Sequence, residues 1–281
     1  MMGPEQYDPT APATVASIQT LHSRVIRKYR KDYFPPADLV VIDEAHHMSG
    51  SRTWQEILEH YKDVLVLGLT ATPISTRGNG LGHYFDFMVK CPGIQELTGL
   101  GYLVPVRYFV GTLADLNNVK IQAGDYNESQ LESEMDKVTL IGDICENWVR
   151  HCQGRKTMAF AVGIKHSIHI VDEFNKLGVK AAHIDGKTPV YERDRILRDF
   201  EHGDITILSN CMILTEGADI TFTSAIIYAR PTKSLRLYLQ IVGRGLRPHP
   251  GKTDLIVLDH GGVVYEFGGG VARPWDWHLT Y

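Results

Sequence analysis

The sequence predicts an α/β fold in which parallel strands are buried between helices. Two observations support this prediction. Short runs of aliphatic and β-branched residues recur along the chain, and stretches with apolar residues at helical spacing separate them. Strands that are apolar throughout are buried on both faces, which is typical of parallel sheets connected by helices. The alternation of the two patterns therefore indicates the α/β class.

The first unit is predicted to span residues 1–98. Asp38–Ile42 and Val64–Leu69 are continuous aliphatic runs, which predict strands, and the mixed polar and apolar stretch Trp54–Tyr61 between them predicts a helix. The stretch 99–134 has no helical period and many turn residues, which indicates a connector between two units.

The second unit is predicted to span residues 135–262 and repeats the same alternation. Its predicted strands are Thr157–Val162, Lys180–Ile184, Ile205–Ser209, Ser224–Ala229 and Asp254–Leu258. Its predicted helices are Ser133–His151, which starts in the connector, His166–Leu177, Tyr191–Glu201 and Ser234–Leu246. The tail 263–281 is rich in glycine and then in aromatic residues, and we expect Trp275 and Trp277 to dock it onto a domain surface, because exposed tryptophan promotes association.

The composition excludes several classes of protein. Of the 281 residues, 43% are hydrophobic and 22% are charged, so the chain is not a wholly disordered one. No apolar run approaches the roughly 18 residues that a membrane span needs, and the N-terminus does not resemble a signal peptide. The 4 cysteines form no C-x-x-C pair, so we expect neither a zinc site nor a disulfide framework, and a cytoplasmic location. The net charge of −4 means that nucleic-acid binding would need a local basic patch.

Two adjacent carboxylates follow the first predicted strand. In the run DLVVIDEAHHMS, Asp43 and Glu44 come directly after apolar residues. Ligands of open α/β sheets bind at the carboxyl ends of strands, and two carboxylates there suit a magnesium–phosphate site, in which one holds the metal and the other polarises an attacking water. Surface acids that cap the next helix are the alternative. Capping accounts for one acid, but not for the next strand and its ending, Thr70-Ala71-Thr72-Pro73.

A basic segment in the second unit is the other candidate site. Residues 220–253 contain no acid, and their basic residues are Arg230, Lys233, Arg236, Arg244, Arg247 and Lys252. The end of the predicted helix 234–246 is formed by the run QIVGRGLR, so we expect Arg244 and Arg247, three residues apart, to project to similar sides of a continuing helical turn. With Gln240, they suit the charge of a transferring γ-phosphoryl group. A single arginine there would instead indicate a solvated group that complements the helix dipole.

These segments resemble motifs of the superfamily 2 helicases. Asp43-Glu44-Ala45-His46 is similar to motif II, Leu69–Pro73 to motif III, and QIVGRGLR to motif VI. The most similar subgroup is that of the DEAD/DEAH-box and restriction-subunit-like translocases, which includes phage-type ATP-dependent helicases. The resemblance runs from Thr14 to about His260. It implies two tandem RecA-like domains with parallel sheets, with ATP and Mg²⁺ in the cleft between them.

The resemblance also implies roles for individual residues. Residues 215–219, TEGAD, are similar to motif V, and residues 183–188 and 15–21 are similar to two further blocks of the subgroup. Asp43 would coordinate Mg²⁺. The implied roles are catalytic for Glu44, Arg244 and Arg247, nucleotide binding or coupling for Asp43, His46, Thr70, Thr72, Asp219 and Gln240, and nucleic-acid binding for Thr20, Thr188 and Thr215.

The phosphate-binding loop of such an ATPase is missing from the sequence. The loop has the pattern G-x-x-x-x-G-K-[ST] between a strand and a helix. Gly251-Lys252-Thr253 and Gly154-Arg155-Lys156-Thr157 end in a similar way, but both lack the first glycine at the required spacing and lead into predicted strands. We therefore expect the first RecA-like domain to be incomplete at its N-terminus. An upstream polypeptide would then supply the loop, or the chain would be inactive.

The expected function is that of an ATP-dependent helicase or translocase acting on single-stranded or duplex DNA, with RNA as an open alternative. Two other functions are also compatible with the motifs. One is a degenerate scaffold that binds nucleic acid or a partner without hydrolysing ATP. The other is the motor subunit of a restriction complex whose nuclease lies in another chain.

Overall fold

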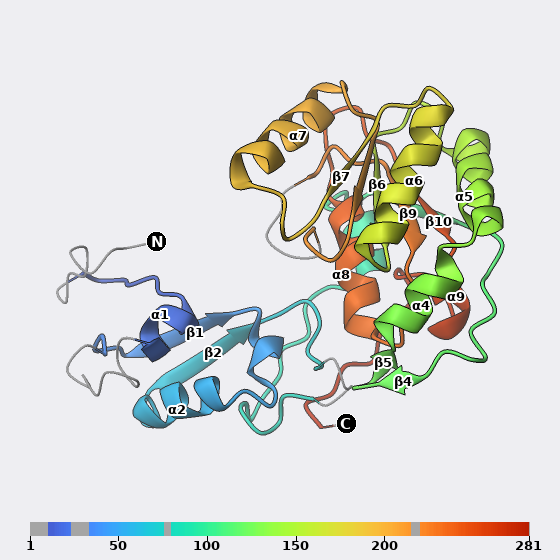
Figure 1. Ribbon diagram of the computed structural model, residues 1–281. Coiled ribbons are helices and arrows are strands. Elements are labelled where there is room, and N and C mark those ends of the chain that lie inside the picture. The colour runs from blue at the N-terminus through green and yellow to red at the C-terminus, as the bar shows by residue number, and fades with distance from the viewer. Residues whose placement is uncertain (1–10, 24–33, 76–79, 215–219, 281) are drawn as a thin grey trace. The chain divides into compact units, whose positions relative to one another are not determined.

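The chain forms two compact units. Residues 1–89 and 277–281 make up the first unit, and residues 90–276 make up the second. The computed structural model describes residues 11–23, 34–75, 80–214 and 220–280 (Figure 1). The polypeptide enters the second unit at Lys90 and leaves it after Asp276. An ion pair joins these two points, because Lys90 Nζ lies 3.0 Å from the Asp276 carboxylate.

The first unit is a two-stranded parallel sheet with short helices. Among its described residues, the elements are α1 Ile18–Leu21, β1 Leu39–Asp43, a 3-10 turn Ala45–Met48, α2 Arg52–His60 and β2 Leu65–Leu69. The two predicted strands and the helix between them are confirmed. The helix begins earlier than predicted because the Ser51 hydroxyl accepts a hydrogen bond from the Trp54 N–H and caps its first turn.

The two faces of the β1–β2 sheet differ in exposure. Ile42 is buried, and Val40 and Val66 pack with it against α2 and the loop after β2. The opposite face is apolar and between 48% and 76% exposed, and its side chains are Leu39, Val41, Leu65, Leu67 and Leu69. The strands pair Leu39 with Leu65 and Val41 with Leu67, so these side chains form one continuous surface. We call these five residues the open face.

The C-terminal residues of the chain complete the first unit. The Gly82 N–H donates a 2.8 Å hydrogen bond to the Leu279 carbonyl. The Leu279 side chain packs against the cluster that contains Ile42, Ala45 and Leu81. The tail thus docks through Leu279, which the sequence did not indicate. Trp275, which was expected to dock the tail, donates a 3.0 Å hydrogen bond from its Nε1 to the Val271 carbonyl, four residues earlier in the chain.

The second unit contains a parallel sheet of six described strands in the order β3-β10-β9-β6-β8-β7. Its strands are β3 Val106–Val110, β6 Thr157–Ala161, β7 Ala181–Ile184, β8 Ile207–Asn210, β9 Ala225–Ala229 and β10 Leu255–Asp259, with a small hairpin of β4 Ile121–Gln122 and β5 Asp125–Tyr126. Its helices are α3 Ile94–Gly99, α4 Glu128–Met135, α5 Val138–His151, α6 Ile164–Lys176, α7 Val190–His202, α8 Leu235–Leu246 and α9 Val263–Glu266. The predicted α/β class with parallel strands is confirmed.

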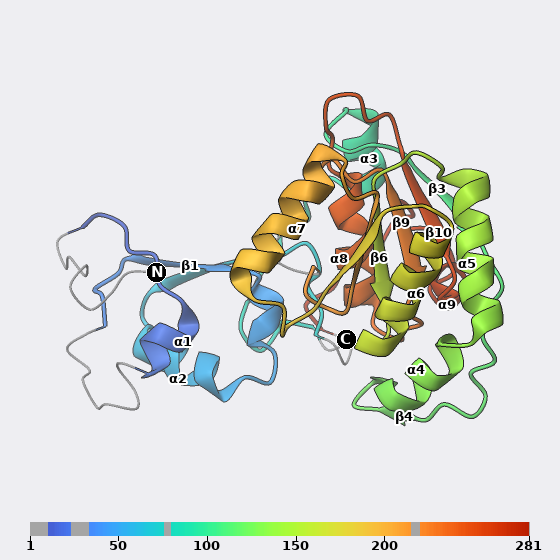
Figure 2. The same ribbon diagram turned by 45° about the horizontal axis from the view of Figure 1, so that its top comes forward.

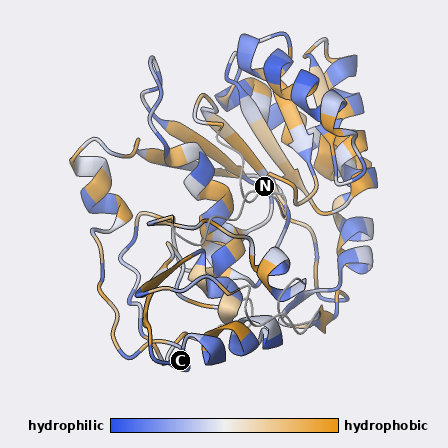
Figure 3. Ribbon diagram, turned by 90° about the vertical axis from the view of Figure 1, so that its left-hand side faces the viewer, coloured by the Kyte–Doolittle hydropathy of each residue, from blue (hydrophilic) through white to orange (hydrophobic). Residues whose placement is uncertain are grey.

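Helices cover both faces of this sheet. The side chains of α5 and α6 form one hydrophobic cluster with β6, β9 and β10, and the two helices lie side by side in two views (Figure 1, Figure 2). Helix α8 packs on the opposite face, where a Cβ atom on Gly245 would lie 2.6 Å from Leu255 and 2.9 Å from Ile226. Hydropathy colouring shows the central strands as mostly hydrophobic, whereas the helices alternate between hydrophobic and hydrophilic turns (Figure 3).

Two segments differ from the sequence-based expectation. Val106–Val110 lies in the expected connector, 99–134, but forms strand β3 at the edge of the sheet. Arg107 interrupts its apolar pattern, and this polar side chain is tolerated because it reaches Asp254. The single helix predicted over 133–151 is two helices, which break where Asp136 caps α4 and binds His169 on α6. No helix in the described part of the chain is long and apolar enough to cross a bilayer.

Asp254 joins the edge strand to the turn before β6. Arg107 Nε donates a 2.8 Å hydrogen bond to one Asp254 oxygen, and Arg155 Nη1 donates a 2.7 Å bond to the other. Burial alone would raise the pKa of Asp254, but the bonds from Arg155 and Arg107 outweigh it and lower the pKa from its usual 3.8.

We expect Asp254→Asn to lower the free energy of unfolding at neutral pH by about 1–3 kcal/mol, because two guanidinium groups lose a charged acceptor. Since the folded pKa is lowered, this stabilisation is present above pH 3.8 and disappears as the pH falls through the folded value. Urea unfolding across this range measures the difference. Asp172→Asn, at an exposed position of α6, is the matched control, and an equal effect of both substitutions at neutral pH would contradict the assignment.

Candidate functional site

The acidic turn after β1 projects two carboxylates from the end of a strand. Asp43 is the last residue of β1 and is exposed, and its Oδ1 accepts a 2.9 Å hydrogen bond from the Glu44 N–H. The 3-10 turn that follows buries Ala45, His46 and Met48. The buried residues anchor the turn, so the two acids before it are held at the carboxyl end of the strand.

Glu44 has an unusual backbone conformation. Its φ of 50° and ψ of 48° lie in the left-handed region, which is uncommon for a residue other than glycine. Such a conformation persists only where the surroundings impose it, and it occurs often at functional sites. Here the buried turn after Glu44 and the bond to Asp43 impose it.

Hydrogen bonds join the acidic turn to the segment after β2. The buried side chain of His46 places Nδ1 2.8 Å from Thr70 Oγ1 and 3.3 Å from the Glu44 carboxylate. Thr70 Oγ1 also accepts a 3.1 Å hydrogen bond from the Thr72 N–H. The structure therefore brings together Glu44, His46, Thr70 and Thr72, which the sequence placed in two separate motifs.

A glycine in β2 allows this arrangement. Gly68 pairs with Ile42 across the sheet, and a Cβ atom at Gly68 would lie 2.3 Å from the Phe85 ring and 3.0 Å from Ala45. A side chain at this position would therefore push against the first residue of the buried turn. The glycine in the run LVLGL is the sequence signal for this close contact.

The arginine segment is formed by the last turn of α8 and the residue after it. Gln240 and Arg244 are four residues apart on the helix and are both partly buried. Arg247 is exposed and caps the helix with an extended backbone, φ −62° and ψ 134°. The expectation of one continuing helical turn is therefore wrong for Arg247. Pro248 explains the difference, because a residue before proline is disfavoured in the helical conformation.

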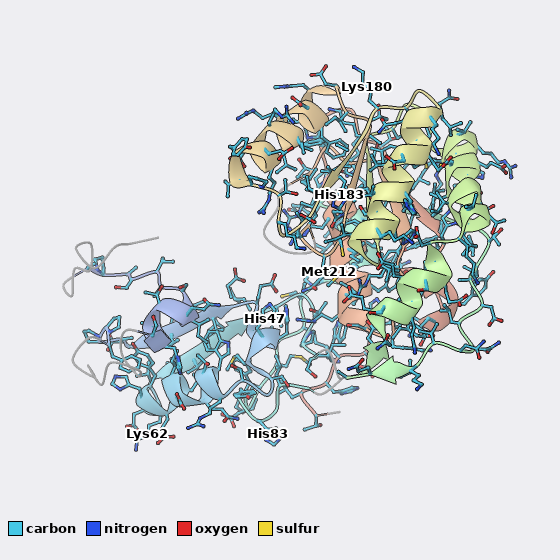
Figure 4. All side chains as sticks on the ribbon, in the orientation of Figure 1. His47, Lys62, His83, Lys180, His183 and Met212 are labelled. Carbon is cyan, nitrogen blue, oxygen red and sulfur yellow. The ribbon has the colours of Figure 1, made fainter. Side chains whose placement is uncertain are left out.

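Thr188 lies in a tight turn at the carboxyl end of β7. Asp185 Oδ1 accepts hydrogen bonds from the Lys187 N–H at 2.8 Å and from the Thr188 N–H and hydroxyl at 2.9 and 3.1 Å. Burial alone would raise the pKa of Asp185, but these bonds lower it. The turn precedes α7, which starts at Val190. The turn can be located in Figure 4 from the label of His183, which lies in β7 two residues before Asp185.

The remaining predicted residues are more scattered or not described. Thr20 lies in α1, and its hydroxyl accepts a 2.8 Å hydrogen bond from Ser17. Thr215 and Asp219 lie outside the described residues. Met212, which is labelled in Figure 4, follows β8 and has a positive φ of 61°. Lys252 was named in the sequence only as part of the basic segment and of an imperfect phosphate-loop pattern, whereas in the structure its Nζ contacts the backbone carbonyls of Thr221 and Arg247.

Two protein families match the chain. The family described as "Helicase conserved C-terminal domain" matches residues 136–249. The family described as "Type III restriction enzyme, res subunit" matches residues 2–75. The first match lies within the second unit, and the second match covers the segment that contains the acidic turn and Thr72.

Several proteins of known name are similar in sequence. A 51.5 kDa protein of a Lactococcus phage is 36% identical over 78% of this chain and 48% of its own length. A Schizosaccharomyces pombe protein, named as the mitochondrial ATP-dependent helicase irc3, is 33% identical over 92% of this chain and 43% of its own length. The Saccharomyces cerevisiae IRC3 protein is 32% identical over 87% of this chain and 36% of its own length. The chain thus spans less than half the length of these relatives.

Solved structures share the fold. A fragment of an HsdR subunit of a type I restriction enzyme from Vibrio vulnificus aligns with a TM-score of 0.67 at 23% identity, over 87% of this chain and 48% of that one. The type ISP restriction-modification enzyme LlaBIII aligns with a TM-score of 0.59 at 19% sequence identity. The alignment covers 85% of this chain and 19% of that one. The predicted RecA-like fold is confirmed by these likenesses.

The left-handed backbone at Glu44 predicts that a glycine variant is more stable than an alanine variant at this position, which is the reverse of their order in a helix. We expect Glu44→Gly to be more stable than Glu44→Ala by about 1 kcal/mol, because alanine keeps the left-handed strain and glycine does not. Both variants lose the same carboxylate, so the comparison isolates the backbone. The free energies of unfolding from urea titrations measure it.

The control is the same pair of substitutions at Glu59, an exposed position within α2. In a helix, glycine is less stable than alanine by about 1 kcal/mol, so the order should reverse. Finding alanine the more stable residue at both positions would rule out strain at Glu44.

Proposed function

The chain belongs to the superfamily 2 helicase family, and from this premise we propose that it hydrolyses ATP to move along or unwind DNA. The observation that carries the proposal is the joining of the acidic turn to the segment after β2. His46 contacts Thr70 at 2.8 Å, so a change at the carboxylates can be transmitted to a second segment through one hydrogen bond.

Asp43 is the residue that we propose to hold the Mg²⁺ of MgATP. Magnesium in such sites is bound by one or two carboxylates together with phosphate oxygens and waters, rather than by a cage of protein ligands. The described residues contain no group of three or more His, Cys, Asp or Glu side chains placed to hold a metal. An exposed carboxylate at a strand end fits this kind of site, and the metal would neutralise phosphate charge there.

Glu44 is the residue that we propose as the general base. Its carboxylate is 46% exposed, so water can reach it, while its backbone is held in one conformation. In this role it accepts a proton from the water that attacks the γ-phosphoryl group. The contact with His46 orients the carboxylate, and Thr70 and Thr72 complete the coupling segment.

Arg244 and Arg247 are proposed to stabilise the negative charge of the transferring phosphoryl group, with Gln240 and Asp219 also on the nucleotide side. Guanidinium groups suit this role because they donate several hydrogen bonds in a planar array.

The proposed contacts of Thr20, Thr188 and Thr215 are with nucleic-acid phosphates, which hydroxyl groups bind without reading sequence. Because phosphate contacts do not read the 2′-hydroxyl group that distinguishes RNA from DNA, RNA is the alternative substrate.

We propose that the phosphate-binding loop of this ATPase lies outside residues 1–281. The pattern G-x-x-x-x-G-K-[ST] does not occur in this sequence, and the similar helicases are more than twice as long as the parts that match. We propose that a polypeptide segment carrying this loop, upstream in the same protein or in another chain, packs on the open face. The five apolar side chains of the open face favour such a segment, because contiguous exposed apolar surfaces mark interaction sites.

A second candidate is the motor subunit of a restriction complex. The match of residues 2–75 to the res subunit family favours it. This candidate shares the ATPase mechanism but requires a nuclease partner. Copurification of a nuclease with the chain from its native source would separate it from a free-standing helicase. A scaffold that does not hydrolyse ATP would instead bind nucleic acid with no effect of ATP.

We expect Glu44→Gln and Arg247→Ala each to lower ATP hydrolysis by on the order of 10³-fold while nucleotide affinity changes little. Loss of the base or of an arginine finger acts on the transition state more than on the bound ground state. The measurement is DNA-stimulated ATP turnover, beside nucleotide binding, in an assembly that contains the phosphate loop. Lys176→Met, at an exposed position of α6, is the control, and wild-type turnover in both site variants would remove these residues from catalysis.

We expect residues 1–281 alone to show background ATP turnover with single-stranded DNA. Without the phosphate loop, the nucleotide loses the backbone N–H groups and the lysine that bind its phosphates. Turnover should appear when a polypeptide with the loop is fused or added. Robust turnover by residues 1–281 alone would contradict the proposal and require a phosphate site elsewhere in the chain.

A further inference from the structure

The end of helix α8 needs partners for its last carbonyl groups. The final carbonyls of a helix have no partner within the helix. The Leu246 carbonyl accepts a 2.9 Å hydrogen bond from the Val104 N–H. Arg247 is followed by Pro248, and Pro250 comes two residues later. Neither proline has an N–H, so the turn after Arg247 has few backbone donors.

Lys252 supplies the missing donor. Its Nζ donates a 2.9 Å hydrogen bond to the Arg247 carbonyl and a 3.0 Å bond to the Thr221 carbonyl. The turn closes on itself, because the Lys252 N–H also bonds the His249 carbonyl at 2.9 Å, and Gly251 adopts a positive φ of 81°. A single ammonium group thus connects the end of α8 with the segment that leads into β9.

We propose that Lys252 is a positioning residue, which holds the backbone of Arg247 and the segment at Thr221 at a fixed separation. The proposal rests on the proposed function of Arg247. Thr221 follows the motif V-like residues 215–219 by two positions, so the bonds from Lys252 would set the relative placement of two segments on the nucleotide side. A displacement of about 1 Å in such groups can lower a rate on the order of 10²-fold.

The surroundings of Lys252 contain no compensating carboxylate among the described residues, and burial lowers its pKa from 10.5 to about 8. The other titratable or cationic groups on the segments that meet there include His249, whose Nδ1 lies 3.3 Å from Thr221 Oγ1, Arg247, and Lys156, which lies over the Phe222 ring. Asp254, two residues after Lys252, is paired instead with Arg107 and Arg155. Loss of the proton leaves neutral donors, and charge-assisted bonds are roughly twice as strong as neutral ones. Positioning should therefore weaken above about pH 8.

The effect on stability has the opposite sign. The folded pKa lies below that of an unfolded lysine, so the unfolded state binds more protons between pH 8 and 10.5. The contribution of Lys252 to the free energy of unfolding therefore rises with pH over this range. A fall in rate over the same range would reflect lost positioning, because Lys252 itself does not promote unfolding there.

The test compares Lys252→Met, Lys252→Arg and the control Lys176→Met in the ATPase-active assembly, with Arg247→Ala beside them. We expect Lys252→Met to lower kcat by 10- to 100-fold with KM nearly unchanged, and Lys252→Arg to recover most of this loss. The wild-type rate should fall above about pH 8, whereas the arginine variant should keep its rate because arginine stays charged. Lys176→Met should behave as the wild type.

Hydrogen exchange on residues 1–281 provides a readout that does not depend on hydrolysis. Lys252→Met should lose protection in the peptides around Arg247 and Thr221, and Lys252→Arg should retain it. Unchanged exchange in Lys252→Met, or lost protection with an unchanged kcat, would overturn the proposal. A wild-type rate in Arg247→Ala would instead indicate that the proposed function of Arg247 is wrong, while the exchange data would still report on the contacts of Lys252.

Discussion

The contact between His46 and Thr70 depends on the parallel pairing of β1 and β2. Asp43 pairs with Leu69, so the residues that follow the two strands emerge next to each other. The 3-10 turn then buries the His46 ring at the position where the Thr70 hydroxyl can reach it. A shift of one residue in the register would turn every side chain to the other face and separate the two motifs. The close approach of Gly68 to Ala45 and Phe85 holds the buried turn against the sheet.

Most of the fold could be predicted because its central strands are apolar on both faces. The predicted strands over 38–42, 64–69, 157–162 and 205–209 overlap β1, β2, β6 and β8, since a run without polar residues is hard to place elsewhere. Strand β3 was missed because Arg107 breaks its pattern, and its acceptor, Asp254, is 147 residues away in the sequence. The break between α4 and α5 was missed for a similar reason, because the partners of Asp136 lie on α6.

The candidate site was predictable in its residues but not in its geometry. The motifs identified Glu44 and His46, but the left-handed backbone at Glu44 has no sequence signal, because left-handed residues are usually glycine or asparagine. The pair Arg244 and Arg247 was expected on one helical turn, although Pro248 was visible in the sequence and places Arg247 beyond the helix. Lys252 was dismissed as the end of an imperfect phosphate loop. Its partners are backbone carbonyls of Arg247 and Thr221, and contacts with backbone groups leave no side-chain signal in a sequence.

The chain crosses between its two units twice, and this has a consequence for a cleaved protein. A protease that cuts between Val89 and Lys90 would divide the first unit between two fragments, because residues 277–281 belong to that unit. The larger fragment would keep Leu279, whose side chain is packed among Ile42, Ala45 and Leu81 of the smaller one. The nicked molecule would stay together through that hydrophobic cluster until a denaturant released it. Size-exclusion chromatography under native conditions would therefore give the size of the uncut protein, whereas a denaturing gel would show two fragments.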